Sequence, residues 1–137
     1  MRRAKYGSTK VTVLGITFDS KTEADYYLLL LARKQAGEIK SISLQPVYLL
    51  QERFTKGGKT IRPIEYIADF EIEYPDGHIE VVDVKGMETA DFKLKRKLFD
   101  HHYPHLKLTR MRNVKKFGGW ITHEEWVLMK RREATKA

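Results

Sequence analysis

The sequence lacks cysteine and has no long apolar run. Without thiols it can form neither a disulfide framework nor a thiolate metal site. The longest apolar segment, Tyr26 to Ala32, is far shorter than the roughly 20 residues that cross a bilayer, and no apolar run follows the basic residues at the N-terminus. We therefore expect a soluble cytoplasmic protein that makes no use of a membrane.

The chain has 137 residues, of which 42% are apolar, and this suits one domain with one core spanning residues 1–137. Its formal net charge of +8 is unevenly distributed. Residues 93–137 contain thirteen Lys and Arg against four acids, whereas residues 1–92 contain thirteen against fourteen. A basic C-terminal third indicates either a solvated surface or a surface that binds nucleic acid.

An acidic island lies beside this basic region. Residues 65–91 contain nine Asp and Glu and a single cation, Lys85. Carboxylates close to a bound polyanion are favourable when a divalent cation lies between them. The island therefore strengthens the nucleic-acid interpretation.

The patterning predicts a mixed sheet flanked by helices, which is an α/β or α+β domain. We expect a hairpin around Gly15 and a helix from the capping box at Ser20 to about Ala36. The remaining expected elements are an extended stretch over 41–54, strands over 64–74 and 78–85, a helix over 89–103, a strand over 106–112 and a last helix from about 122. The expected core order is α-β-β-β-α-β.

The stretch Pro75-Asp76-Gly77 is typical of a type I turn closing a three-residue hairpin loop. That turn pairs Tyr74 with His78 and therefore places Asp69 directly opposite Asp83. Side-chain alternation adds Lys85 to the face of the two aspartates. The opposite face is expected to carry Ala68, Phe70, Val82 and Val84.

Two carboxylates about 5 Å apart repel each other by about 3 kcal/mol at an effective dielectric constant near 20. One interpretation is that both aspartates are exposed and solvated, with Lys85 neutralising one of them. The other is a hard divalent cation, because Mg²⁺ prefers carboxylate oxygens, a carbonyl such as that of Val84, and water.

Four segments resemble the PD-(D/E)XK nuclease superfamily, and within it a small phage-type family of uncharacterised proteins. They are Phe18–Tyr27, Leu44–Pro46, Tyr66–Phe70 and Val81–Met87. The resemblance implies a restriction-endonuclease-like core over about residues 5–112, followed by a helical extension over about 118–134. Small basic members of the superfamily include Holliday junction resolvases, so the resemblance implies DNA, possibly branched, as the partner and a homodimer under that interpretation.

Carried over by resemblance, the catalytic residues are Glu23, Asp69, Asp83 and Lys85. The cofactor implied is Mg²⁺ or Mn²⁺, held by Asp69, Asp83, the Val84 carbonyl and Glu23. Ala68 replaces the proline of the motif, and the literal Pro75-Asp76 is only the turn. Glu23 has an alternative role as the N3 residue of the capping box, although its alignment with Tyr27 and Leu30 turns it toward the sheet. Gln45 is a weaker candidate for the site.

The basic residues after the motif are expected to form a phosphate track on DNA. They are Lys93, Arg96, Lys97, Lys107, Arg110, Arg112, Lys115 and Lys116. Three histidines, His101, His102 and His105, lack a matching carboxylate and are not expected to bind metal, and Trp120 and Trp126 are expected to pack rather than stack on bases. The expected function is a metal-dependent DNA endonuclease; a catalytically inactive DNA-binding module and a structural or assembly protein are the alternatives.

Overall fold

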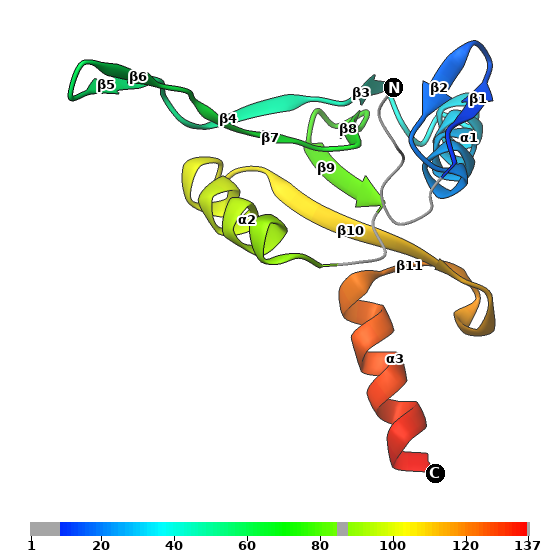
Figure 1. Ribbon diagram of the computed structural model, residues 1–137. Coiled ribbons are helices and arrows are strands. Elements are labelled where there is room, and N and C mark those ends of the chain that lie inside the picture. The colour runs from blue at the N-terminus through cyan, green and yellow to red at the C-terminus, as the bar shows by residue number, and fades with distance from the viewer. Residues whose placement is uncertain (1–8, 85–87, 137) are drawn as a thin grey trace.

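The computed structural model describes residues 9–84 and 88–136 (Figure 1). The first half contains β1 (Val11–Val13), β2 (Ile16–Phe18), α1 (Lys21–Gln35), β3 (Ser41–Leu44), β4 (Val47–Gln51), β5 (Phe54–Lys56), β6 (Lys59–Ile61) and β7 (Ile64–Ile67). The second half contains β8 (Phe70–Glu73), β9 (Ile79–Val84), α2 (Ala90–His102), β10 (Lys107–Val114), a 3-10 turn (Lys115–Phe117), β11 (Gly119–Thr122) and α3 (His123–Lys136).

The central sheet is mixed and has the strand order β11-β10-β9-β8-β3. Its β9 and β10 pair in parallel, and the other neighbours pair antiparallel. Along the chain, α1, β3, β8, β9, α2 and β10 follow one another, with β4 to β7 inserted between β3 and β8. The predicted mixed α/β fold is therefore confirmed, and the expected order of elements holds once the insertion is set aside.

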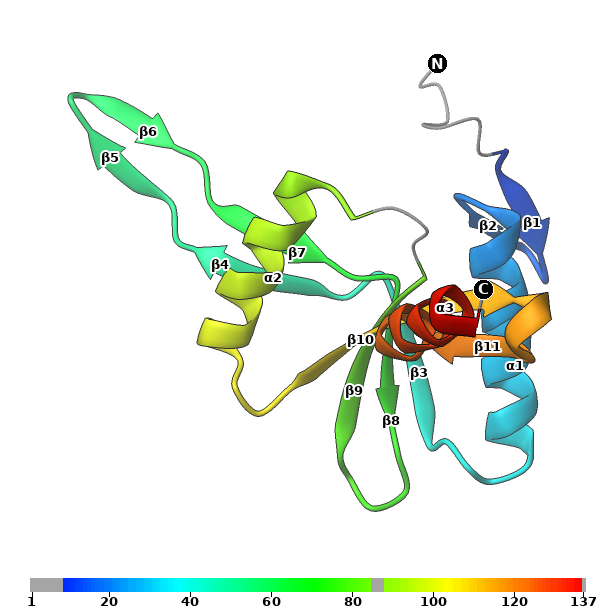
Figure 2. The ribbon, with the colours of Figure 1, turned by 90° about the horizontal axis from the view of Figure 1, so that it is seen from below.

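Two apolar clusters cover the two faces of the sheet. On one face, Leu30 and its neighbours on α1 pack with Val82 and Val84 of β9. On the other face, Phe92 and Phe99 of α2 pack with Val81, which precedes Val82 and therefore points to the opposite side of the strand. Figure 2 shows α1 and α2 on opposite sides of the strands. Consequently β9 is buried on both faces, as is usual for a strand with a parallel neighbour.

The turn at residues 75–77 forms as predicted. The Tyr74 amide donates to the His78 carbonyl (3.0 Å), and the Gly77 amide donates to the Tyr74 carbonyl (2.9 Å). Gly77 has φ +93°, which residues with a Cβ rarely adopt. Phe70 pairs with Val82, so the predicted hairpin register is confirmed.

Replacing Gly77 with Ala should lower the free energy of unfolding by about 1 kcal/mol, because the left-handed backbone is strained for Ala. Nothing lies within 4 Å of the added Cβ, so the loss would come from the backbone alone. Gly77→Asn is the matched control and should lose less, since Asn tolerates this conformation. Urea denaturation measures both, and equal losses would contradict the strained-backbone explanation.

The expected strand over 64–74 is wrong, because the chain forms two strands that belong to different sheets. β7 pairs with β4, whereas β8 pairs with β3 and β9. Between them the Asp69 amide donates to the Asp83 carboxylate (2.9 Å) instead of a backbone carbonyl. This break ends the simple alternation, and Ala68 therefore packs in the α2 cluster with Val81 rather than with Phe70.

The C-terminal part also differs from expectation. Residues 118–120, expected at the start of the helical extension, instead contribute to a tight turn and to β11, which pairs with β10. Gly118 (φ +95°) and Gly119 (φ +109°) allow this turn. The helix α3 then projects away from the sheet (Figure 1). No helix in the described ranges is long and apolar enough to cross a membrane.

Both tryptophans make contacts within the chain, as expected. The Trp120 ring lies 5.0 Å from the Tyr26 ring, edge to face. The Arg112 guanidinium lies 3.9 Å from the centroid of the Trp126 ring, which attaches the start of α3 to β10.

Candidate active site

Asp69 and Asp83 lie close together at the open end of the β8–β9 hairpin, and a backbone amide donates to each carboxylate. The Asp69 amide donates to Asp83 Oδ1 (2.9 Å), and the Val84 amide donates to Asp69 Oδ2 (2.8 Å). Charge-assisted hydrogen bonds of this kind fix the orientation of a carboxylate. The two aspartates predicted from the turn are therefore brought together with defined geometry.

The interpretation in which both aspartates are solvated is wrong for Asp83. Its side chain is fully buried, and Asp69 is half-buried. Burial follows from the position of β9, which has β8 on one side and β10 on the other. The face expected to carry a charge cluster thus holds one fully buried and one half-buried carboxylate.

Asp69 lines a cavity of about 90 Å³ together with Glu23 and Gln45. The remaining wall consists of residues 16–18 and Leu44. A cavity of this size holds an ion or a few water molecules. Three residues predicted for the site from separate parts of the sequence, on α1, on the β3–β4 connection and before β8, therefore meet at one cavity.

The backbone of Glu23 belongs to the helix cap, and its side chain lines the cavity. Its amide donates to Ser20 Oγ (3.1 Å), which confirms Ser20 as the N-cap. Its half-buried side chain lies on the side of α1 that carries Leu30, which is fully buried. The side chain lines the cavity, in agreement with the predicted orientation of Glu23 toward the sheet.

Gln45 has a stronger place in the site than its sequence context indicated. Its backbone has φ +47°, an unusual conformation for a residue with a Cβ. Its amide donates to the Asp69 carbonyl (3.0 Å), and the next hydrogen bond runs from the Ala68 amide to the Pro46 carbonyl (3.1 Å). Strained backbone of this kind is concentrated at functional sites.

The donor set fits a hard divalent cation in part. Mg²⁺ needs only one or two carboxylates and keeps several waters, so Asp69, Asp83 and the Val84 carbonyl suit it. In the described ranges no three His, Cys, Asp or Glu side chains gather into a single metal-binding group. The structure thus does not assemble Glu23 into one cluster with both aspartates. Lys85 lies outside the described residues.

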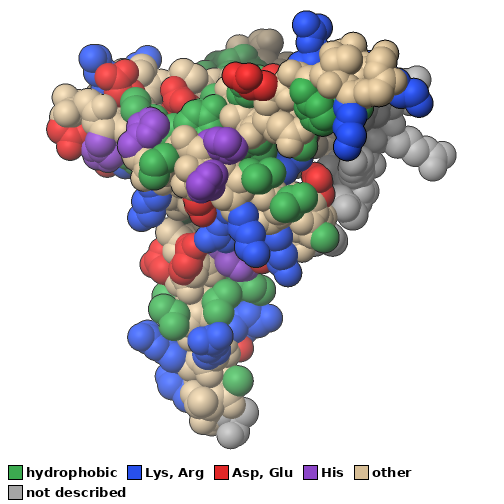
Figure 3. Space-filling model, turned by 90° about the vertical axis from the view of Figure 1, so that its left-hand side faces the viewer, with side chains coloured by type: hydrophobic (Ala, Val, Ile, Leu, Met, Phe, Trp, Pro, Cys, Tyr) green, Lys and Arg blue, Asp and Glu red, His purple; other side chains and the backbone are tan. Residues whose placement is uncertain are grey.

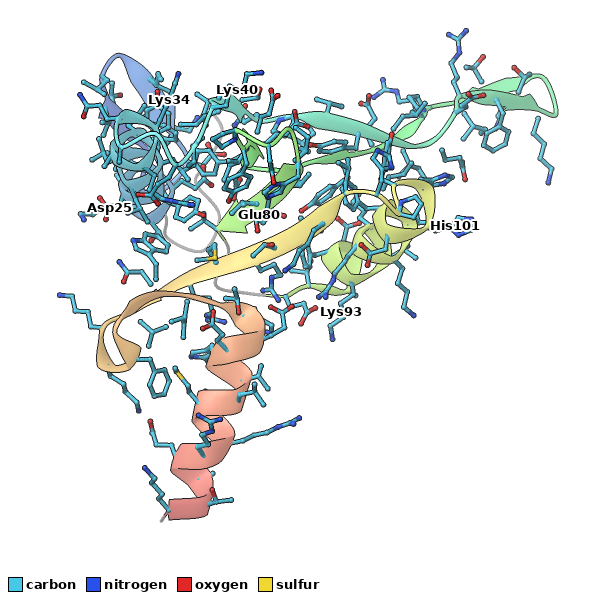
Figure 4. All side chains as sticks on the ribbon, turned by 180° about the vertical axis from the view of Figure 1, so that it is seen from behind. Asp25, Lys34, Lys40, Glu80, Lys93 and His101 are labelled. Atoms are coloured by element: carbon cyan, nitrogen blue, oxygen red, sulfur yellow. The ribbon has the colours of Figure 1, made fainter. Side chains whose placement is uncertain are left out.

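Several acids of the acidic island have structural partners. Glu80 accepts hydrogen bonds from the hydroxyls of Tyr74 (2.7 Å) and Thr109 (2.8 Å), and it lies centrally in the molecule (Figure 4). Glu71 accepts from the Tyr48 hydroxyl. Glu71 and Glu80 are therefore bound to hydroxyl groups within the fold, which composition alone could not show.

The expectation that Arg110 belongs to a phosphate track on the surface is wrong. Its side chain is 2% exposed because β10 is a central strand, and it is the register partner of Asp83. The guanidinium lies 4.9 Å from the centroid of the Phe92 ring, and Nη1 lies 3.6 Å from Glu88 Oε2. Burial lowers the pKa of Arg110, and the carboxylate of Glu88 acts in the opposite direction.

The rest of the expected track is partly exposed. Arg96 lies 3.8 Å from both Glu88 and Glu124, and Lys116 pairs with Glu133 (2.6 Å). The exposed members are Lys93, Lys97, Lys107, Lys115 and Lys116. Lys and Arg side chains are numerous on the lower half of the face in Figure 3, which includes α3. His101 lies at the outer end of α2 (Figure 4).

A mixed sheet between two helices, with paired aspartates at the end of a central hairpin, defines an α/β domain with a carboxylate-lined site. The chain belongs to the family described as "Protein of unknown function (DUF1064)", whose model matches residues 3–119. Comparisons with curated proteins and with solved structures find no match to this chain.

Proposed function

We propose that the protein is a metal-dependent DNA endonuclease of the PD-(D/E)XK type that acts in the cytoplasm on branched DNA, in the manner of a junction resolvase. The observation that carries the proposal is a pair of hydrogen bonds, from the Asp69 amide to Asp83 and from the Val84 amide to Asp69, beside a cavity lined by Asp69 and Glu23. The order of elements, which agrees with that of the superfamily apart from one insertion, supports it.

In the proposed mechanism, Asp69, Asp83 and the Val84 carbonyl hold Mg²⁺ or Mn²⁺. The ion supplies Lewis-acid stabilisation of the scissile phosphate. The amides of Asp69 and Val84 keep the two carboxylates aligned, so little reorganisation is needed during reaction. Glu23 accepts a hydrogen bond from water in the cavity and orients it. Lys85 is proposed to stabilise charge on the phosphate.

A DNA-binding module without catalysis is the second candidate. It is favoured by the backbone hydrogen bonds that the two aspartates accept, since such bonds also serve a purely structural role at the strand break. The third interpretation, an assembly protein with an acidic docking face, has less support, because Asp83 is buried and Glu80 is hydrogen-bonded internally.

Incubation with a labelled four-way junction, a linear duplex and a single strand tests the proposal. Cleavage of the junction is expected with Mg²⁺ and not with chelator. Binding without cleavage under all conditions would favour the inactive module. Failure to bind any of the three DNAs would contradict both nucleic-acid interpretations. A sedimentation measurement of the same sample checks the dimer expected of a resolvase.

Replacing Glu23 with Gln should slow cleavage by about tenfold to a hundredfold, in line with groups that support metal ligands. Gln also serves at the third position of a capping box, so the helix should keep its stability. Single-turnover cleavage rates and thermal melts measure the two effects. Unchanged cleavage with a lower melting temperature would assign Glu23 to capping alone.

A further inference from the structure

An arm made of residues 47–67 leaves the sheet at the candidate site. Strand β4 starts just after Gln45 and strand β7 ends just before Asp69, and the Gln45 amide donates to the Asp69 carbonyl (3.0 Å). Its far end is the β5–β6 hairpin, which projects well beyond the rest of the molecule (Figures 1 and 2). The arm and the site are therefore parts of one continuous structure.

The base of the arm is anchored. Tyr48, Leu50 and Tyr66 are buried against α2. The Tyr103 hydroxyl donates to the Leu49 carbonyl (2.9 Å). Because packing and a hydrogen bond hold the base, the direction in which the tip projects is set by the fold.

The tip, residues 53–62, carries four cations and no acid, namely Arg53, Lys56, Lys59 and Arg62. Every residue from 51 to 65 is exposed. None of the four cations forms an ion pair with a described residue. The tip points toward the viewer at the upper right of Figure 3, where Lys and Arg side chains surround hydrophobic ones.

The β5–β6 pairing orders these side chains. Phe54 pairs with Ile61, and Lys56 pairs with Lys59, so alternation places all four on one face. Like charges directly opposite each other are unfavourable in an isolated hairpin. Phe54 and Ile61 are 43% and 38% exposed, which is also unfavourable in water. An anionic partner whose groove also offers apolar contacts would offset both the charge repulsion and the exposure of the apolar side chains.

We propose that the tip of this arm is a DNA-binding element that contacts the duplex beside the cleavage position. A two-stranded ribbon fits the major groove of B-DNA, and apolar side chains on such ribbons contact bases or sugars while lysines meet phosphates. The proposal rests on the proposed function, since it takes DNA as the substrate.

The length of the arm defines where the contact falls. Eight residues separate Asp69 from Ile61, which corresponds to about 26 Å in extended strands. At about 3.4 Å per base pair this distance is about eight base pairs. The arm should therefore extend the protected region of a bound duplex on one side of the site by about that length.

Self-association is the competing use of this surface. The face of the arm turned away from α2 exposes Val47 and Ile67, which are register partners and could meet a second copy. A symmetric contact through the tip would, however, bring two sets of four cations together. Charge complementarity therefore favours DNA at the tip.

The test compares two variants that remove the same charge. Lys56→Gln with Lys59→Gln alters the tip, and Lys10→Gln with Lys34→Gln removes two exposed lysines elsewhere, Lys34 being on α1 (Figure 4). Binding to a labelled four-way junction and a duplex is measured by anisotropy over a salt series, with chelator present to prevent cleavage. The tip variant should bind about tenfold more weakly, with a salt dependence reduced by about two phosphate contacts. The control should stay within about threefold of wild type.

A second variant separates DNA contact from self-association. Phe54→Ser with Ile61→Ser should weaken DNA binding and leave the salt dependence unchanged, because no charge is removed. Sedimentation of the free protein should be unaffected. If sedimentation changes and DNA affinity does not, the tip is a self-association surface and the proposal is overturned.

Cleavage assays with Mg²⁺ keep the two proposals distinguishable. If the wild-type protein binds DNA through the tip but cuts none, the arm is supported and the nuclease proposal fails. If the wild-type protein cuts and the tip variant binds and cuts equally well, the arm proposal fails alone. If the wild-type protein binds no DNA, both fail.

Discussion

Replacing Asp83 with Asn should reduce DNA cleavage by on the order of a hundredfold or more, because even the partners that support metal ligands contribute 10–100-fold. Asn keeps an Oδ1 that can accept the hydrogen bond from the Asp69 amide (2.9 Å), so the local fold should persist. What is lost is the negative charge that holds the cation. Affinity for DNA should remain near that of wild type, since a carboxylate does not attract phosphates. Gel assays of cleavage with Mg²⁺ and anisotropy with chelator measure the two properties.

Asp76→Asn is the matched control. Asp76 belongs to the literal Pro-Asp pair but lies at the exposed tip of the turn, where its Oδ1 accepts from the His78 amide (3.0 Å). Asn can accept the same bond, so cleavage should be unchanged. A variant at Asp83 that still cuts at the wild-type rate, or a variant at Asp76 that does not cut, would contradict the assignment of the site.

Replacing Arg110 with Ala should lower the free energy of unfolding by about 3–5 kcal/mol, the range found when one partner of a buried ion pair is removed. The side chain is 98% buried, so truncation also leaves a cavity beside Phe92. Two nearby carboxylates, those of Glu88 and Asp83, lose the cation that compensates them. Urea denaturation is the measurement.

Two further variants separate the contributions of packing and charge at Arg110. Arg110→Met keeps much of the side-chain volume and should lose less stability than Arg110→Ala. The difference between the two losses measures the contribution of packing. Lys107→Ala, on the same strand but exposed, should change stability by no more than about 0.5 kcal/mol. A loss of this small size at Arg110 would mean that the guanidinium is not a buried partner of the acids.

Local chemistry was sufficient to predict the pairing of the two aspartates. Pro75 and Gly77 select a turn, the turn sets the register, and the register places Asp69 opposite Asp83. The N-cap at Ser20 was predictable for the same reason, since both features depend on residues only a few positions apart.

The prediction from side-chain alternation was wrong where the chain leaves the central sheet. The prediction for Ala68 assumed a continuous strand, but the Asp69 amide bonds to a side chain and the strand divides there. Gln45 was only a weak candidate because its contact with Asp69 joins residues 24 positions apart. No local pattern reports such a contact.

The sequence by itself determined the mixed α/β class, the hairpin register and the concentration of basic residues, because periodicity, turn residues and composition act over short distances along the chain. Only the tertiary structure decided that Asp83 and Arg110 are buried partners on adjacent strands, that Glu23 and Gln45 share a cavity with Asp69, and that residues 47–67 form a projecting arm. These features depend on which strands pair and which helix covers them, and long-range packing alone sets that choice.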